Sequence, residues 1–109
     1  MDLTPQQTLG QWLLRALHGN NGRATKSQAL MIMEQRFGHL LTADDRLLEP
    51  KVNEEKWENR TAWERNKLVE SGFLQPTSES GHGVWALAQA GTQAAQRAEQ
   101  IAASRGDKK

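Results

Sequence analysis

The stretch GHGVWALAQAG, residues 81–91, decides the fold of the second half of this 109-residue chain. Glycines flank its histidine, His82, and because glycine adopts left-handed backbone angles at little cost, this tripeptide predicts a turn. The residues that follow alternate between two faces, as the side chains of a β-strand do, with Trp85 and Leu87 on the same face. We therefore predict a strand that buries Trp85 and Leu87, followed by a helix.

The segments on either side of this strand extend the pattern. Upstream, the extended run Phe73 to Pro76 is joined to the strand by the polar segment Thr77 to Gly83, which predicts a β-hairpin. Before it, a helix is predicted from about Glu54 or Glu55 to Ser71, with Gly72 closing it. Downstream, the segment from Gln89 to Arg105 is rich in alanine and glutamine and predicts a helix. The thin apolar stripe of that helix consists of Ala94, Ala98, Ile101 and Ala102.

The first half of the chain predicts two more helices. Thr4 is the expected N-cap of the first, with a proline at its first position, and the Gly/Asn-rich run after His18 ends it. The second begins at Thr25 or Ser27 and ends at Gly38. Both carry apolar residues at helical spacing, so each is expected to bury one face.

Two connections and the tryptophans complete the prediction. The residues from Gly22 to Thr25 form either a short strand or an extended link, and Thr42 to Glu55 predicts a loop with one short helix. Trp63 is expected in the core, although it could instead stack on a base or a sugar. Trp57, near a helix start and flanked by charge, is expected to be the most exposed tryptophan.

Composition limits the classes of protein that fit. With 37% apolar and 25% charged residues, the chain predicts a single globular domain over residues 1–105 and a disordered tail over 106–109. The absence of cysteine excludes disulfides, thiolate catalysis and finger-type zinc sites. No signal peptide and no apolar run of membrane-spanning length are found, so we expect a cytoplasmic protein without a membrane partner.

The three histidines, His18, His39 and His82, are far apart in sequence and lack the carboxylate spacing of a metal or catalytic site. We therefore expect no enzymatic activity, no metal site and no cofactor. The order helix, helix, helix, hairpin, helix predicts a mainly α fold with a small β-hairpin. This order of elements is that of a winged helix-turn-helix, with a three-helix core, a wing and a C-terminal helix.

Particular residues of the second half make this expectation more specific. They are Asn59, Arg60, Trp63, Leu68, Gly72, Leu74, Gly83, Val84, Trp85, Leu87 and Gly91. This pattern resembles the N-terminal domain of Mrr-type restriction proteins, winged-helix domains of bacterial DNA-restriction systems. The resemblance implies binding of double-stranded DNA, with modified bases as the target. Glu64 departs from it, because the family usually has a small residue there. The nuclease that normally follows such a domain is absent from this chain, so a nuclease or effector partner is expected.

In a winged helix, the third helix enters the major groove, where Arg and Asn contact base edges and Lys and Arg contact phosphates. The candidate DNA-binding residues of this helix are Arg60, Arg65, Asn66, Lys67, Asn59 and Lys56. His82, at the tip of the wing, and Arg23 and Lys26, near the second helix, are secondary candidates.

Two alternatives stay open. Residues 54–70 contain five Glu against four Lys and Arg, so the charges could simply form a solvated face stabilised by pairs along the helix. The small residues of the C-terminal helix would also allow close approach of a second copy. The chain could therefore be a protein-association or dimerisation module, or a small transcriptional regulator. The net charge of +1 favours association and requires any DNA contact to be local.

Overall fold

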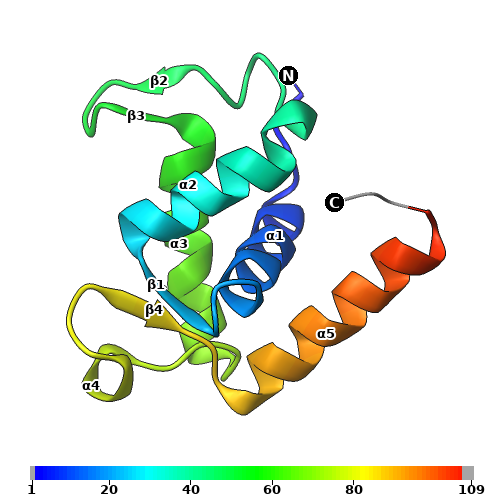
Figure 1. The fold of residues 1–109 in the computed structure, drawn as a ribbon. Coiled ribbons are helices and arrows are strands. Elements are labelled where there is room, and N and C mark those ends of the chain that lie inside the picture. The colour runs from blue at the N-terminus through cyan, green and yellow to red at the C-terminus, as the bar shows by residue number, and fades with distance from the viewer. Residues whose placement is uncertain (1, 107–109) are drawn as a thin grey trace.

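The computed structural model describes residues 2–106 and shows a mainly helical chain with small antiparallel sheets (Figure 1). In chain order the elements are α1 (Gln6–His18), β1 (Arg23–Thr25), α2 (Lys26–Phe37), the 3-10 helix η1 (Gly38–Leu40), β2 (Leu48–Glu49), β3 (Glu54–Glu55), α3 (Lys56–Glu70), α4 (Thr77–Ser80), β4 (Val84–Ala86) and α5 (Gln89–Ser104). Of the predicted disordered tail, Gly106 lies in a turn and residues 107–109 fall outside the described part.

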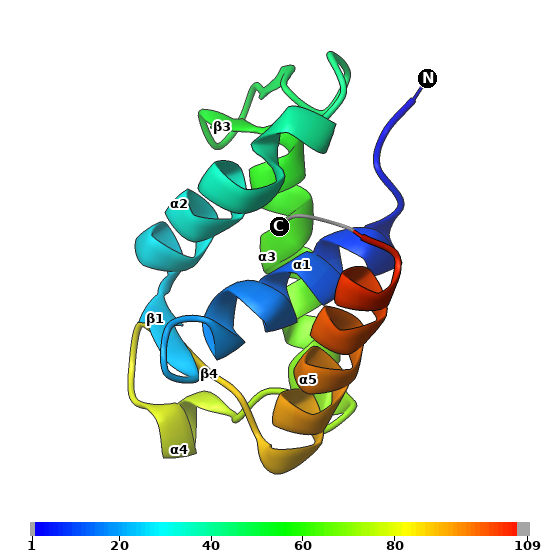
Figure 2. The same ribbon diagram turned by 45° about the vertical axis from the view of Figure 1, so that its right-hand side comes forward.

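Helix α1 forms the centre of the molecule, between α2 and α5 in Figure 2, and it also packs against α3. Its apolar stripe Leu9, Leu13 and Leu17 is fully buried, as the helical spacing predicted. Trp12 stacks on Phe37 of α2 with ring centroids 5.1 Å apart. The hydrophobic core therefore lies around α1.

The start of α2 was predicted correctly, and the start of α1 was not. Thr25 caps α2 through a capping box with Gln28, which satisfies backbone N–H groups of the first turn. Helix α1 begins at Gln6, with Pro5 as its N-cap and no capping side chain. Thr4 is instead buried, and its hydroxyl donates to the carboxylate of Asp45. A long-range hydrogen bond thus replaces the predicted local cap.

The sheet differs from a simple hairpin. Strand β4 pairs antiparallel with β1, and Ala24 is opposite Trp85. The predicted partner, the run after α3, contributes a single bridge between Leu74 and Leu87. The connection contains the short helix α4 in place of an irregular turn. Trp85 and Leu87 are buried, as predicted.

Residues 42–55 contain turns and a small hairpin, so the short helix predicted there was wrong. Strands β2 and β3 pair antiparallel, and Asn53 has a left-handed backbone, with φ 54°. The backbone N–H of Thr42 donates to Asp45, while the N–H of Asp45 donates to the hydroxyl of Thr42. These reciprocal bonds close a turn and give the backbone an alternative to helix formation.

The apolar stripe predicted for α5 is confirmed in part, since Ala102 is buried and Ala94 packs against the core, but the buried face is turned toward Gly91 and Ala95. Its buried residues are Gly91, Ala95 and Ala102, whereas Ile101 is 46% exposed. Gly91 lies against the backbone carbonyl of Phe73. Glu99 pairs with Arg15 of α1 at 2.6 Å and with Arg36 of α2 at 3.0 Å. An ion-pair cluster and close backbone packing compensate for the scarcity of large apolar residues in α5.

Candidate nucleic-acid interface

One face of α3 combines an exposed aromatic, an exposed amide and an exposed ammonium group with a second, half-buried amide. Asn59, Trp63, Asn66 and Lys67 occur three or four residues apart, which places their side chains on one face of the helix. Trp63 is 63% exposed, and Asn66 and Lys67 are also exposed. Helix α3 runs from the β2–β3 hairpin toward α4 and β4 (Figure 1).

The tryptophans of α3 exchange the places predicted for them. Trp57, expected to be the tryptophan most exposed, is 2% exposed, whereas Trp63, expected in the core, has the largest exposed fraction of the large apolar side chains within residues 2–106. The indole N–H of Trp57 donates to Glu55 at 2.8 Å, so its one polar group is satisfied while its ring fills the core. Trp57 and Trp63 are six positions apart, which corresponds to about 600° of rotation around the helix axis and puts their side chains on different sides of α3.

Arg60 was predicted to contact DNA, but the structure places it in a folding contact. Its Nη1 donates to the backbone carbonyl of Thr4 at 2.6 Å and lies 3.8 Å from Oδ1 of Asp45. The side chain is 22% exposed and Asp45 is fully buried. Arg60 therefore ties α3 to the N-terminal segment. No feature of the sequence pattern around Asp45 indicated this network.

Arg65 lies at the junction of α3 and the sheet. Its guanidinium carbon is 5.8 Å from the ring centre of Trp85, within the range of a cation–π contact. Its Nε is buried and has no hydrogen-bond partner within residues 2–106. Burial lowers the pKa of Arg65 from its usual value, although a guanidinium remains charged at neutral pH.

The other predicted residues are dispersed. Lys56 pairs with Glu49 at 3.3 Å, and Lys26 pairs with Glu54 at 2.8 Å. Arg23 donates to the carbonyl of Ser80 at 2.9 Å, which joins β1 to α4. His82 is exposed between two glycines with positive φ, 99° and 76°. The structure therefore brings together Asn59, Asn66 and Lys67 and places the other six in folding contacts, in ion pairs or in the exposed turn at residues 81–83.

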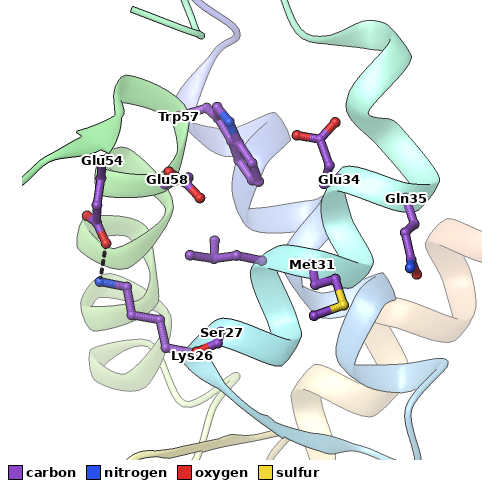
Figure 3. A pocket seen from close by; sticks show the side chains of 9 residues that line it. Lys26, Ser27, Met31, Glu34, Gln35, Glu54, Trp57 and Glu58 are labelled. Atoms are coloured by element: carbon purple, nitrogen blue, oxygen red, sulfur yellow. Dashed lines mark ion pairs between the residues drawn. The ribbon is translucent and has the colours of Figure 1, made fainter. Parts of the chain in front are cut away.

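A groove of about 480 Å³ lies between α2 and α3 (Figure 3). Its lining contains three glutamates, Glu34, Glu54 and Glu58, against one lysine, Lys26. Trp57 and Glu58 of α3 belong to this groove, so it is on a different side of the helix from Trp63. The acidic lining makes this groove unsuited to phosphate. The candidate surface for nucleic acid is therefore the face of α3 that carries Trp63.

The described residues contain neither a metal-binding cluster nor a membrane-spanning helix. Within residues 2–106, no group of three or more His, Cys, Asp or Glu residues could hold a metal ion. None of the helices in that part of the chain has the length and apolar character needed to cross a bilayer.

The arrangement is that of a small helical domain built on a central helix, with an aromatic and amide side chains displayed on α3. The family model of the Mrr N-terminal domain matches residues 7–97, from the start of α1 into α5. The chain therefore belongs to the Mrr N-terminal domain family, as its sequence pattern indicated, and this associates it with Mrr-type restriction systems. Comparisons with curated proteins and with solved structures gave no match.

Proposed function

We propose that this chain is a winged helix-turn-helix domain that binds double-stranded DNA through the exposed face of α3. The element order supports the winged-helix assignment, since β1 lies between α1 and α2 and pairs with β4, the strand that follows the segment after α3. The single observation that carries the proposal is Trp63, exposed between amide and ammonium side chains on α3. An exposed indole offers a flat face that can stack on a base or a sugar, and the amide and ammonium groups beside it suit base edges and phosphates.

The chemistry of the face fits a duplex. Lys67 supplies a charge for phosphate, while Asn59 and Asn66 can donate to and accept from base edges. The segment Gly81 to Gly83 is the proposed wing, with His82 contacting the backbone or the minor groove. Membership of the Mrr N-terminal domain family supports a role in bacterial restriction, in the cytoplasm, with modified DNA as the target and a nuclease or effector as partner.

A duplex-binding titration at two ionic strengths tests the proposal. Neutralisation of phosphates releases counterions, so affinity for DNA falls as salt rises. Because the net charge is only +1, we expect a shallow slope that reflects a few local contacts. Binding at low salt that weakens at higher salt supports the proposal, and no binding to plain or modified duplex at low salt overturns it.

A second candidate function is homodimerisation through α5, which would give a dimeric regulator with two α3 helices. A groove of about 430 Å³ runs along α5 and includes Phe73, Ala94, Ala98 and Ile101. Glutamines at its rim, Gln11 and Gln93, can both donate and accept hydrogen bonds, which suits a surface facing a copy of itself. Sedimentation equilibrium tests this: a dimer that Ile101→Glu converts to a monomer supports it, and a monomer at high concentration overturns it.

A further inference from the structure

We infer that the exposed face of α3 reads A·T base pairs in preference to G·C pairs. This inference rests on the proposed function, because it assigns a sequence preference to the same surface. The inference comes from which side chains of α3 are free of folding contacts and which are engaged in them. Trp63 and Asn66 are exposed and Asn59 is half-buried, and neither amide makes a hydrogen bond within residues 2–106, whereas both arginines of the helix are engaged in folding contacts.

Asparagine matches adenine in the major groove. Its amide can donate to N7 and accept from the N6 amino group of the same base, which gives a bidentate contact. Within residues 2–106, the side-chain hydrogen bonds of α3 are made by Lys56, Trp57, Glu58, Arg60 and Thr61. Asn59 and Asn66 take part in none of them, so their amides keep their full hydrogen-bonding capacity for a partner.

Trp63 suits thymine, the base that pairs with adenine. The methyl group at C5 of thymine is the one apolar group that an unmodified base pair presents in the major groove. An indole that is 63% exposed offers a flat apolar surface to such a methyl group, and covering it removes apolar area from water. Trp63 lies one turn after Asn59 and one turn before Asn66, so an amide flanks the indole on each side.

Guanine, by contrast, is read most often by arginine or lysine at O6 and N7. Arg60 is bound to the carbonyl of Thr4, and Arg65 is packed over Trp85. Lys67 remains on the flank of the face, where a flexible point charge suits phosphate. Glu70, the last residue of α3, repels phosphate at the C-terminal end of the face and confines the contact to the preceding turns.

Duplexes of equal length and charge separate this contact from non-specific binding. Fluorescence anisotropy with the full chain compares an A·T-rich duplex, a G·C-rich duplex, and the A·T-rich duplex with either uracil in place of thymine or 7-deazaadenine in place of adenine. We expect the A·T-rich duplex to bind about tenfold more tightly than the G·C-rich duplex. Uracil removes the methyl group and 7-deazaadenine removes N7, so each should abolish much of that preference.

Variants assign the preference to residues. Trp63→Ala should abolish the discrimination between thymine and uracil, and Asn66→Ala should reduce the discrimination between adenine and 7-deazaadenine. Lys67→Ala should weaken all four duplexes equally, and Leu40→Ala, an exposed apolar change in η1, should change none of them. Thermal melting of each variant verifies that it is folded.

The outcomes are distinguishable. Equal affinity for all four duplexes overturns the inference and leaves the proposed function standing. An A·T preference that survives both base substitutions also overturns it, because such a preference would come from the minor groove or from DNA shape. Failure to bind any duplex at low salt overturns the proposed function itself.

Discussion

The hydroxyl of Thr4 donates to the carboxylate of Asp45 at 2.6 Å, across 41 residues of sequence and in a fully buried position. The same carboxylate accepts from the backbone N–H of Thr4 and of Thr42, both at 2.9 Å. Arg60 approaches it to 3.8 Å. This network joins the N-terminal segment, the turn after η1 and α3, so it fixes where α3 begins relative to α1.

Replacement of Asp45 by alanine should therefore destabilise the fold. The change leaves buried donors of Thr4 and Thr42 without a partner, and hydrogen bonds to a charged group contribute about 1.5–3 kcal/mol each. We expect a loss of at least about 2 kcal/mol in urea unfolding. The control is Asp44→Ala, which removes an exposed hydrogen bond from the N–H of Asp2 and should cost about 0.5 kcal/mol or less. Equal losses for the two variants would contradict the prediction.

Stability should decline in acid through the buried Asp45 and the half-buried Glu99. Burial alone would raise the pKa of Asp45, but the hydrogen bonds from Thr4 and Thr42 outweigh it and lower the pKa below 3.8. Burial likewise opposes ionisation of Glu99, and hydrogen bonds from Arg36 and Arg15 hold its pKa below 4.5.

A group with a lowered folded-state pKa stabilises the fold above its unfolded pKa and loses that contribution as pH falls through the folded value. The free energy of unfolding, measured by urea titration, should therefore be constant near neutral pH and fall below about pH 5. Glu99→Gln should be less stable at pH 7 and should show a shallower acid decline. If the free energy of unfolding of this variant fell with pH as steeply as that of the parent chain, Glu99 would contribute nothing to the acid decline.

Arg60 and Lys67 are both candidate DNA contacts, but their replacement should have different effects on stability. Arg60 is expected to stabilise the fold, and Lys67 is expected to be a surface residue. Arg60→Ala removes a hydrogen bond to a backbone carbonyl and should lower the free energy of unfolding by about 1–3 kcal/mol. Lys67→Ala should stay within about 0.5 kcal/mol of the parent chain. Chemical denaturation measures both. An unchanged stability for Arg60→Ala would return that residue to the DNA-contacting set.

The two tryptophans of α3 should differ just as clearly. Trp57→Ala opens a cavity in the core and should cost about 3–5 kcal/mol, whereas Trp63→Ala should be nearly neutral. Acrylamide quenching gives a second measurement, since the collisional quenching of the parent chain should fall when Trp63 is replaced by phenylalanine. A parent chain that is quenched no more than this variant would mean that Trp63 is covered in solution.

Gly91→Ala should destabilise α5 although alanine is the better helix former. Propensity alone would favour alanine by about 1 kcal/mol. However, a Cβ at this position would overlap the backbone carbonyl of Phe73, which cannot move independently of the bridge between Leu74 and Leu87. We expect a net loss in thermal stability. Gln93→Ala, an exposed change on the same helix, should be neutral or slightly stabilising, and the opposite ranking would show that α5 can shift.

The helices were predictable because their signals are local. The capping residue Thr25, the apolar stripe of α1 and the glycine that follows α3 each act over a few residues, and the structure places these elements where the pattern indicated. The buried face of β4 was equally readable, since alternation fixes which side chains share a face. The resemblance to the Mrr N-terminal domain was also predictable from the sequence, and the match to the family model confirms it.

Several of the errors concern long-range choices, whereas the helix wrongly predicted in residues 42–55 has a local cause in the reciprocal bonds of Thr42 and Asp45. Thr4 has the side chain of an N-cap, yet it donates to Asp45, because a buried carboxylate gains more from it than a helix start does. In the same way β4 pairs with β1 across most of the chain instead of forming an extended hairpin with its neighbour. Sequence gives no register between segments that are distant along the chain.

The candidate site shows the same division. By itself the sequence determined that α3 is a helix that carries tryptophans, amides and both signs of charge. Only the tertiary structure decided which of its faces is buried. Trp57 belongs to the core cluster that contains side chains of α1 and α2, Trp63 stays in water, and Arg60 is hydrogen-bonded to the carbonyl of Thr4. The physical reason is that residues six positions apart lie on different sides of a helix, and which side becomes core depends on the elements packed against it.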